Sequence, residues 1–102
     1  MPEAKQVIDA ILEAGGLTLQ QLAQLSEVEP EWISRHIAEG LLSPGKEQAG
    51  EWRFSSASLL RIRRIVSLER DFEAVPELAA LVADLEEEIA ILRKRLQRAG
   101  LD

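Results

Sequence analysis

The sequence predicts a mainly α-helical fold, a winged helix-turn-helix with a short β-hairpin wing and a long C-terminal coiled-coil-type helix. Between Leu22 and Phe54, two short helical patterns with a turn between them are followed by Gly40, an apolar pair and a loop that ends in an aromatic strand. After Pro76, apolar residues recur at alternating spacings of four and three, which is the heptad pattern of a coiled coil.

The composition narrows the possible functions. The chain has 102 residues, of which 46% are hydrophobic, so one small domain with a helical extension can build a core. A net charge of −6 opposes binding to nucleic acid or anionic membranes and favours a basic partner. The absence of cysteine suits a reducing cytoplasm, and no signal peptide or membrane span is expected. We therefore expect a cytoplasmic protein.

The start of the chain predicts two short helices. Residues 3–14 have apolar side chains at helical spacing and form an extra N-terminal helix within residues 1–16. Thr18 is placed to cap the next helix, residues 19–25, because its hydroxyl can accept a hydrogen bond from a free amide of the first turn.

The second helix of the helix-turn-helix starts at Pro30, because proline suits the first helical position. Ile33 and Ile37 direct one face of this helix to the core. Gly40 ends it in the left-handed conformation, which glycine adopts at little cost.

Two apolar stretches around a turn-rich loop predict the wing. Leu41-Leu42 forms the first strand, residues 51–54 form the second, and residues 43–50 form the loop between them.

A third helix, residues 57–72, completes the winged domain of residues 17–74, and Ser55 caps it. Its core-facing residues are Leu59, Ile62, Ile65 and Val66. Its other side is basic and carries Arg61, Arg63, Arg64 and Arg70.

The last helix, residues 77–98, lies in a dimerisation segment of residues 75–102, since Pro76 pushes Val75 out of the helical region. β-branched residues at a positions and Leu at d positions favour two strands. The seam consists of Leu78, Val82, Leu85, Ile89, Leu92 and Leu96. We predict a homodimer through this seam. The flanking charges fit either helix orientation, and the alternative is that the helix packs back on its own domain.

Residues suited to catalysis or metal binding are scarce. His36 is the only histidine and there is no cysteine, so we expect no metal, no cofactor and no catalytic residue. The serines near Ser55 are better explained by helix capping than as nucleophiles, because no general base accompanies them. The run Glu86-Glu87-Glu88 is interpreted as a solvated face. We conclude that the protein is not an enzyme.

The turn and second helix of the helix-turn-helix have the wrong charge for DNA. DNA binding draws most of its affinity from phosphates that Lys and Arg neutralise. This segment carries four glutamates against one arginine, namely Glu27, Glu29, Glu31 and Glu39 against Arg35. Nucleic acid is therefore an unlikely partner.

The segment from residue 22 to residue 68 resembles the MerR family of winged-helix regulators. The matching residues are Leu22-Ala23, Val28, Ile33, Gly40-Leu41-Leu42, Pro44, Trp52-Arg53-Phe54, Ser55 and Leu60 through Leu68. The resemblance implies a MerR-like winged helix-turn-helix. Where members usually carry an Arg-Tyr-Tyr run that supports DNA contacts, this chain has Ser34-Arg35-His36, and Glu27 replaces a usual glycine.

A second resemblance covers about residues 17–98. The run from Leu68 to Leu85, followed by residues 92–96, is similar to the C-terminal half of the CbpM chaperone-modulator family. The resemblance implies a protein that binds the J-domain of the DnaJ-like co-chaperone CbpA and inhibits it. It also implies that the partner presents a basic helix, with which a J-domain engages Hsp70. Residues 3–14 depart from the family, which usually enters the domain with a short extended segment.

An acidic surface suits such a basic helix, because opposite charges speed association and set orientation. The candidate partner-binding residues are Glu27, Glu29, Glu31, Trp32, Arg35 and Glu39. Trp32 is the candidate apolar anchor at the edge of the core face, and the alternative is that it completes the core. His36 is interpreted as a satisfied, half-buried histidine.

The alternative function is that of a MerR-type DNA-binding transcription regulator. Arg53 and three arginines of the third helix, Arg61, Arg63 and Arg64, could contact phosphates, and a dimer would bind two half-sites.

Overall fold

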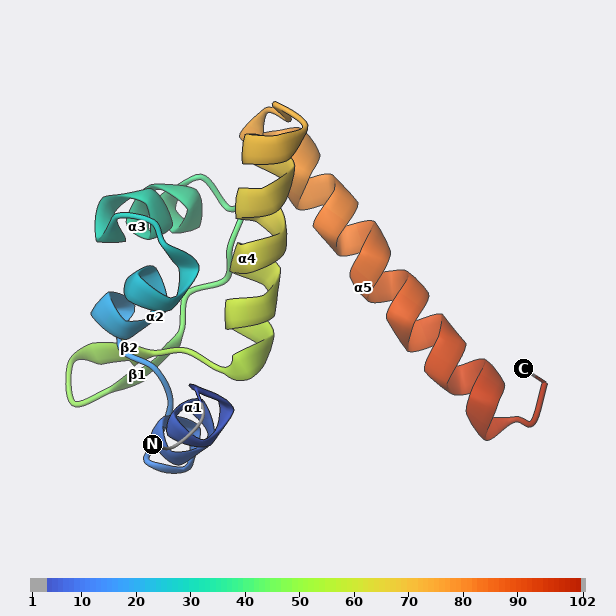
Figure 1. The fold of residues 1–102 in the computed structure, drawn as a ribbon, viewed down its shortest axis with the longest axis horizontal. Helices are drawn as coiled ribbons and strands as arrows, with labels where there is room; N and C mark the ends of the chain where they lie inside the picture. The colour runs from blue at the N-terminus through green and yellow to red at the C-terminus, as the bar shows by residue number, and fades with distance from the viewer. Residues whose placement is uncertain (1–3, 102) are drawn as a thin grey trace.

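The computed structural model describes residues 4–101, and its elements follow the predicted order (Figure 1). The chain forms α1 (Ala4–Glu13), α2 (Leu19–Ser26), α3 (Pro30–Ala38), β1 (Lys46–Gln48), β2 (Glu51–Arg53), α4 (Ser56–Asp71) and α5 (Pro76–Arg98). Within the described residues this gives five helices and one two-stranded antiparallel sheet. The prediction of a mainly α fold with a short hairpin and a long C-terminal helix is confirmed.

Two predicted helix caps are present in the structure. The Thr18 hydroxyl accepts a hydrogen bond from the Gln21 amide at 3.1 Å, and the Gln21 side chain accepts one from the Thr18 amide at 2.9 Å. Each side chain therefore satisfies a backbone donor of the other residue at the start of α2. At the start of α4, the Ser55 hydroxyl accepts a hydrogen bond from the Ser58 amide at 3.3 Å.

The predicted first strand of the wing is wrong. Leu41 and Leu42 lie outside the sheet, and both of their amides donate to the His36 carbonyl beyond the end of α3. The first strand is β1, formed from the predicted loop, and its residue Lys46 pairs with Arg53 of β2. Ala49 and the glycine after it both have positive φ, which is the two-residue turn that matches the twist of a hairpin.

The core lies where α2, α3 and α4 meet the end of the wing. Leu17 and Phe54 form an isolated antiparallel bridge that ties the entry to α2 to the exit from β2. The four predicted core residues of α4 are all buried, and Ile37 packs half-buried against the core. The largest fully buried side chains are Leu17, Leu22, Ile33, Phe54, Ile62 and Ile65.

Helix α5 contacts α4 through a face that the sequence analysis did not identify. This face consists of the buried alanines Ala79, Ala80 and Ala83. Their small side chains let the backbones of the two helices approach closely. With about 100° between successive residues, the predicted seam lies on nearly the opposite side of α5. Of the seam, Val82 is half-buried and the other five residues are exposed. Packing on the protein's own domain therefore leaves the seam free, and Figure 1 shows α5 projecting away from α4.

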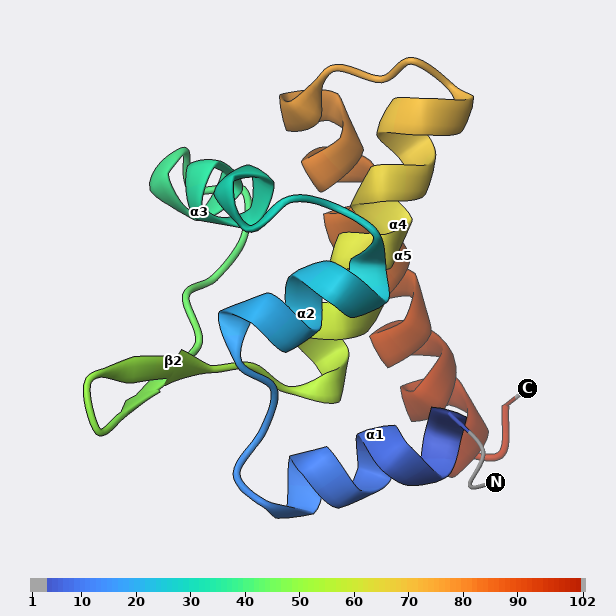
Figure 2. The same cartoon turned by 60° about the vertical axis from the view of Figure 1, so that its left-hand side comes forward.

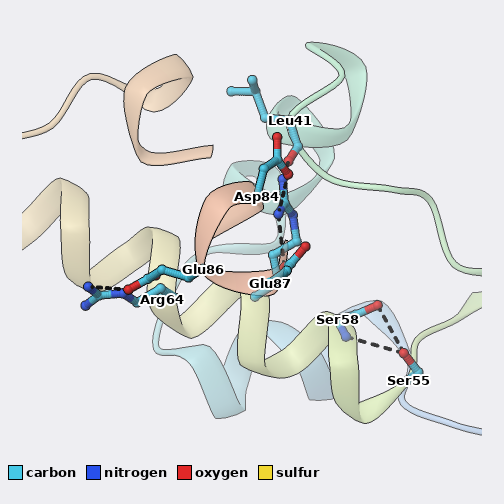
Figure 3. A network of polar contacts seen from close by, with 8 residues as sticks. Leu41, Ser55, Ser58, Arg64, Asp84, Glu86 and Glu87 are labelled. Carbon is cyan, nitrogen blue, oxygen red and sulfur yellow. Dashed lines mark hydrogen bonds and ion pairs between the residues drawn. The ribbon is translucent and has the colours of Figure 1, made fainter. Parts of the chain in front are cut away.

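Arginines of α4 bind carboxylates of α5 (Figure 3). Arg61 contacts Asp84 at 2.8 Å and Glu87 at 3.0 Å, and it donates a hydrogen bond to the Leu41 carbonyl at 3.1 Å. Arg61 thus joins α4, α5 and the segment after α3. Residues 86–88 are exposed, as the interpretation of a solvated face requires, but Glu86 and Glu87 also bind arginines of α4.

Arg64 holds a second carboxylate of α5. It donates two hydrogen bonds to the Glu86 carboxylate, at 2.7 and 3.0 Å. These bonds lower the pKa of Glu86 below its ordinary value and raise the pKa of Arg64. Because the pKa of Glu86 is lower in the folded chain, the pair stabilises the fold at neutral pH, and this contribution is lost as the pH falls through the folded pKa.

Replacing Arg61 with Ala is expected to lower the free energy of unfolding by about 1–2 kcal/mol, because the Leu41 carbonyl loses a charged donor and two carboxylates lose their cation. Both carboxylates are exposed, and water screens their attraction to Arg61. The expected loss of stability is therefore at the lower end of the range for charged hydrogen bonds. Urea denaturation measures the change.

Arg63 is the control, since it is exposed and forms no ion pair with the described residues. Arg63→Ala is expected to change the free energy of unfolding by less than about 0.5 kcal/mol. Equal losses in the two variants would show that Arg61 does not join the three elements.

Candidate partner-binding surface

Three of the predicted partner-binding residues lie together at the start of α3. Glu27 ends α2, Glu29 is the N-cap residue of α3, and Glu31 lies in its first turn. All three side chains are exposed, and none pairs with a cation among the residues that the structure describes. We name this group the acidic end of α3. Its charges are free to meet a partner.

The remaining charged candidates lie elsewhere on the helix. Arg35 follows Glu31 by one helical turn and is also exposed. Glu39 is the C-cap residue, at the opposite end of a helix about 13 Å long. The helix dipole favours acids at the start of α3 and disfavours one at its end. The structure therefore groups Glu27, Glu29 and Glu31 and leaves Glu39 apart from them.

Trp32 packs against the core and is also partly exposed, so it combines the two predicted roles of core residue and apolar anchor. Its indole is half-buried against the core and stacks on the His36 ring, with 3.6 Å between ring centroids and 23° between the planes. His36 is only 3% exposed, more buried than predicted. The His36 Nδ1 atom lies 2.8 Å from the Trp32 carbonyl oxygen, so it donates that hydrogen bond. Trp32 is thus held in place by the core while part of it stays open to solvent.

The contact that links α3 to α4 was missed in the sequence analysis. The His36 Nε2 atom lies 2.9 Å from a carboxylate oxygen of Glu69, which is in the last turns of α4. The two residues are 33 positions apart, so no local spacing could indicate the pair. The sequence did indicate that His36 needs a hydrogen-bond partner, because a histidine beside the core positions Ile33 and Ile37 is buried.

Two of the four arginines proposed for DNA contacts are occupied by close ion pairs. Arg61 and Arg64 bind carboxylates of α5, and Arg53 lies 3.7 Å from Glu51. Arg63 is the member of that group without an ion pair to a described residue. The structure therefore weakens the electrostatic basis of the alternative function.

Glu27 adopts the left-handed conformation, with φ 57° and ψ 41°, although it has a side chain. A residue with a Cβ atom is strained there and glycine is not. We expect Glu27→Gly to raise the free energy of unfolding by about 0.5–1 kcal/mol, measured by urea denaturation. Glu73, with φ 53° between α4 and α5, is a matched control that should gain as much stability when changed to Gly. If Glu27→Gly lowers stability while Glu73→Gly raises it, the Glu27 side chain supports the fold and strain does not decide its effect.

None of the helices within residues 4–101 combines the length and apolar character needed to cross a membrane. No group of three or more potential metal ligands gathers within these residues.

Comparisons with known proteins agree with both resemblances found in the sequence. Residues 17–99 match the family model of the MerR HTH family regulatory proteins. A curated protein from Pseudomonas entomophila (strain L48), named chaperone modulatory protein CbpM, is 29% identical over 77 residues, which is 76% of each chain. No solved structure matches. The family match covers most of the chain and includes the helix-turn-helix, the wing and all of α5. The chain therefore belongs to the MerR HTH family of regulatory proteins.

Proposed function

We propose that this protein is a non-enzymatic modulator in the cytoplasm that binds the J-domain of a DnaJ-like co-chaperone and inhibits it. The acidic end of α3 carries this proposal, because its three carboxylates are exposed beside the half-buried Trp32 and form no ion pair with a described residue. The similarity to a chaperone modulatory protein supports a partner from the chaperone system.

The proposed contact has two parts. The acidic end of α3 attracts a basic helix of the J-domain, which speeds association and weakens as salt is added. The open part of the Trp32 indole provides apolar contact area, and its stacking on His36 fixes the ring before binding, so little conformational entropy is lost. Inhibition follows because the covered helix is the one with which a J-domain engages Hsp70.

Titration calorimetry with the J-domain of the cognate DnaJ-like protein tests the proposal. We expect saturable binding at low salt that weakens steeply when salt is raised. Excess protein should also reduce the ATPase stimulation of Hsp70 by that J-domain. Absence of binding at tens of micromolar in low salt would refute the proposal.

We also propose that a second copy of the chain covers the seam of α5. Exposed leucines and isoleucines at heptad spacing form a continuous apolar face that the protein's own domain leaves open. The charges of α5 are segregated, since Asp84 and residues 86–88 are acidic and residues 93–95 are basic. Asp84, Glu86 and Glu87 bind arginines of α4, whereas Glu88 forms no ion pair with a described residue. An antiparallel pair brings each acidic half beside the basic half of its partner, so we favour that orientation.

Introduced cysteines decide the orientation, because the natural chain has none. Leu85→Cys and Leu96→Cys chains, mixed and oxidised, should form the mixed disulfide in an antiparallel dimer, because these positions lie opposite each other when residues 86–88 face residues 93–95 of the second copy. A parallel dimer would instead join each variant to itself.

DNA-binding regulation remains the second candidate function, and the match to a family of MerR HTH regulators favours it. A mobility-shift assay with genomic DNA fragments separates the two functions. A sequence-specific footprint that weakens steeply with salt would establish the regulator.

A further inference from the structure

A cleft of about 470 Å³ lies between α1, the wing and the start of α4. Figure 2 shows α1 below the hairpin and α3 above it, so the cleft is separate from the acidic end of α3. The cleft is lined by Leu12, Gly15, Gly16, Pro44, Gly45, Lys46, Gln48, Arg53, Phe54, Ser55, Ser56 and Ser58. Gly45 keeps it narrow, because a Cβ atom there would lie 2.5 Å from the Arg53 carbonyl oxygen.

Two cations face each other in this cleft. Lys46 and Arg53 are direct partners in the hairpin register, so their side chains leave the same face of the sheet. Like charges placed directly opposite each other destabilise an antiparallel pair. Lys46 forms no ion pair with a described residue, and Arg53 has only a contact of 3.7 Å to the exposed Glu51. The repulsion between the two cations is therefore largely uncompensated within the described chain.

The lining of the cleft contrasts with the rest of the protein. The chain has 18 acidic residues among 102, yet none of the twelve residues that line the cleft is acidic. The other polar side chains there are hydroxyls and one amide, which can donate hydrogen bonds to an anion. The Ser56 hydroxyl, in the first turn of α4, has no hydrogen-bond partner among the described residues. Two cations, the unbonded Ser56 hydroxyl and the absence of a carboxylate make a site that complements an oxyanion.

We propose that this cleft binds the phosphate group of a small molecule, either inorganic phosphate or a phosphomonoester. Lys46 and Arg53 neutralise the charge of the phosphate from the wing, and the Ser56 hydroxyl donates a hydrogen bond to one of its oxygens from the α4 side. Binding relieves the repulsion between the two cations. The phosphate would thereby tie the wing to the start of α4.

Two-dimensional NMR of the full chain, labelled with ¹⁵N, tests the site. Inorganic phosphate and phenyl phosphate are titrated separately at constant ionic strength. We expect saturable shifts of the amide signals of residues 45–58 and a higher thermal midpoint with ligand. The tighter of the two ligands identifies whether free phosphate or a phosphomonoester is the natural source. Lys46→Gln combined with Arg53→Gln should weaken binding at least tenfold, and its thermal midpoint without ligand should not fall, since the repulsive pair is gone.

Arg63→Gln combined with Lys94→Gln is the matched control, because it removes two exposed cations outside the cleft. The control should bind phosphate like the natural chain. Equal weakening in both double variants, or shifts spread over all basic residues, would overturn the site. Shifts that chloride reproduces at the same ionic strength would overturn it too. A DNA duplex that binds through the same two cations more tightly than either phosphate ligand would overturn the assignment to a small molecule.

Discussion

Reversing two charges at the acidic end of α3 is expected to abolish most of the J-domain affinity. Glu29→Lys combined with Glu31→Lys places two cations where the proposed partner presents a basic helix. We expect a loss of about 2–3 kcal/mol, roughly 30- to 150-fold in the dissociation constant. The loss should fall mainly on the association rate and shrink as salt is raised. Titration calorimetry and stopped-flow tryptophan fluorescence measure the two effects.

The control for this variant carries the same change of net charge at another place. Glu13→Lys combined with Glu47→Lys alters two exposed glutamates, one in α1 and one in the wing. Its J-domain affinity should stay within about threefold of the natural chain. Circular dichroism must show that both variants fold, since lysine at the start of α3 also opposes the helix dipole. If the two variants lose affinity equally, net charge steers the partner and the acidic end of α3 is not the docking surface.

The sequence was sufficient to predict the structural features that depend only on neighbouring residues, such as helix caps and helix starts. Thr18 and Ser55 cap their helices because a short hydroxyl side chain reaches an amide only three residues away. Pro30 and Pro76 begin helices because the proline ring suits the first turn. Ile62 and Ile65 are buried because helical spacing puts them on one face. Each of these depends on a few consecutive residues, which a pattern can show.

Features that depend on distant residues were not predictable in the same way. Arg61 contacts Leu41, 20 residues earlier, and Glu87, 26 residues later, and only the packed fold brings these together. The first strand was misplaced because Leu41 and Leu42 are apolar, whereas β1 is a polar and exposed strand set by its turn. Charge and hydrophobic patterns do not signal such a strand.

The candidate site was predictable in its composition but not in its arrangement. The sequence identified an acidic second helix, and the structure shows that Glu39 lies at the far end from the other acids. It also shows that Trp32 is fixed by His36, whose second nitrogen contacts Glu69. The exposure of Glu29 and Glu31, and their lack of an ion pair with any described residue, support a binding role. Both properties follow from the packed fold and cannot be deduced from the sequence alone.

Replacing Ile89 with Asp is expected to separate the proposed dimer into monomers. Ile89 occupies the middle of the seam, and its side chain is 48% exposed in the single chain. Fully burying an isoleucine contributes about 1.5–3 kcal/mol, and dimerisation can bury only the exposed half of Ile89, so each copy loses about 0.7–1.5 kcal/mol. A symmetric dimer loses two such contributions, so the dissociation constant should rise by roughly 10- to 150-fold. An aspartate that must leave water adds to this loss. Analytical ultracentrifugation over a range of concentrations measures the change.

The matched control lies two residues away on the same helix. Ile91 is 46% exposed, almost the same as Ile89, but it points away from the seam. Ile91→Asp makes the same chemical change and should leave the dimer intact. Both variants should keep the helix content of the natural chain, because neither side chain belongs to the buried core. Equal dissociation by both variants, or a natural chain that sediments as a monomer at every concentration, would show that the seam of α5 is not a dimer interface. The exposed leucines would then be open to a different protein, and the alanine face toward α4 would be the sole packing role of this helix.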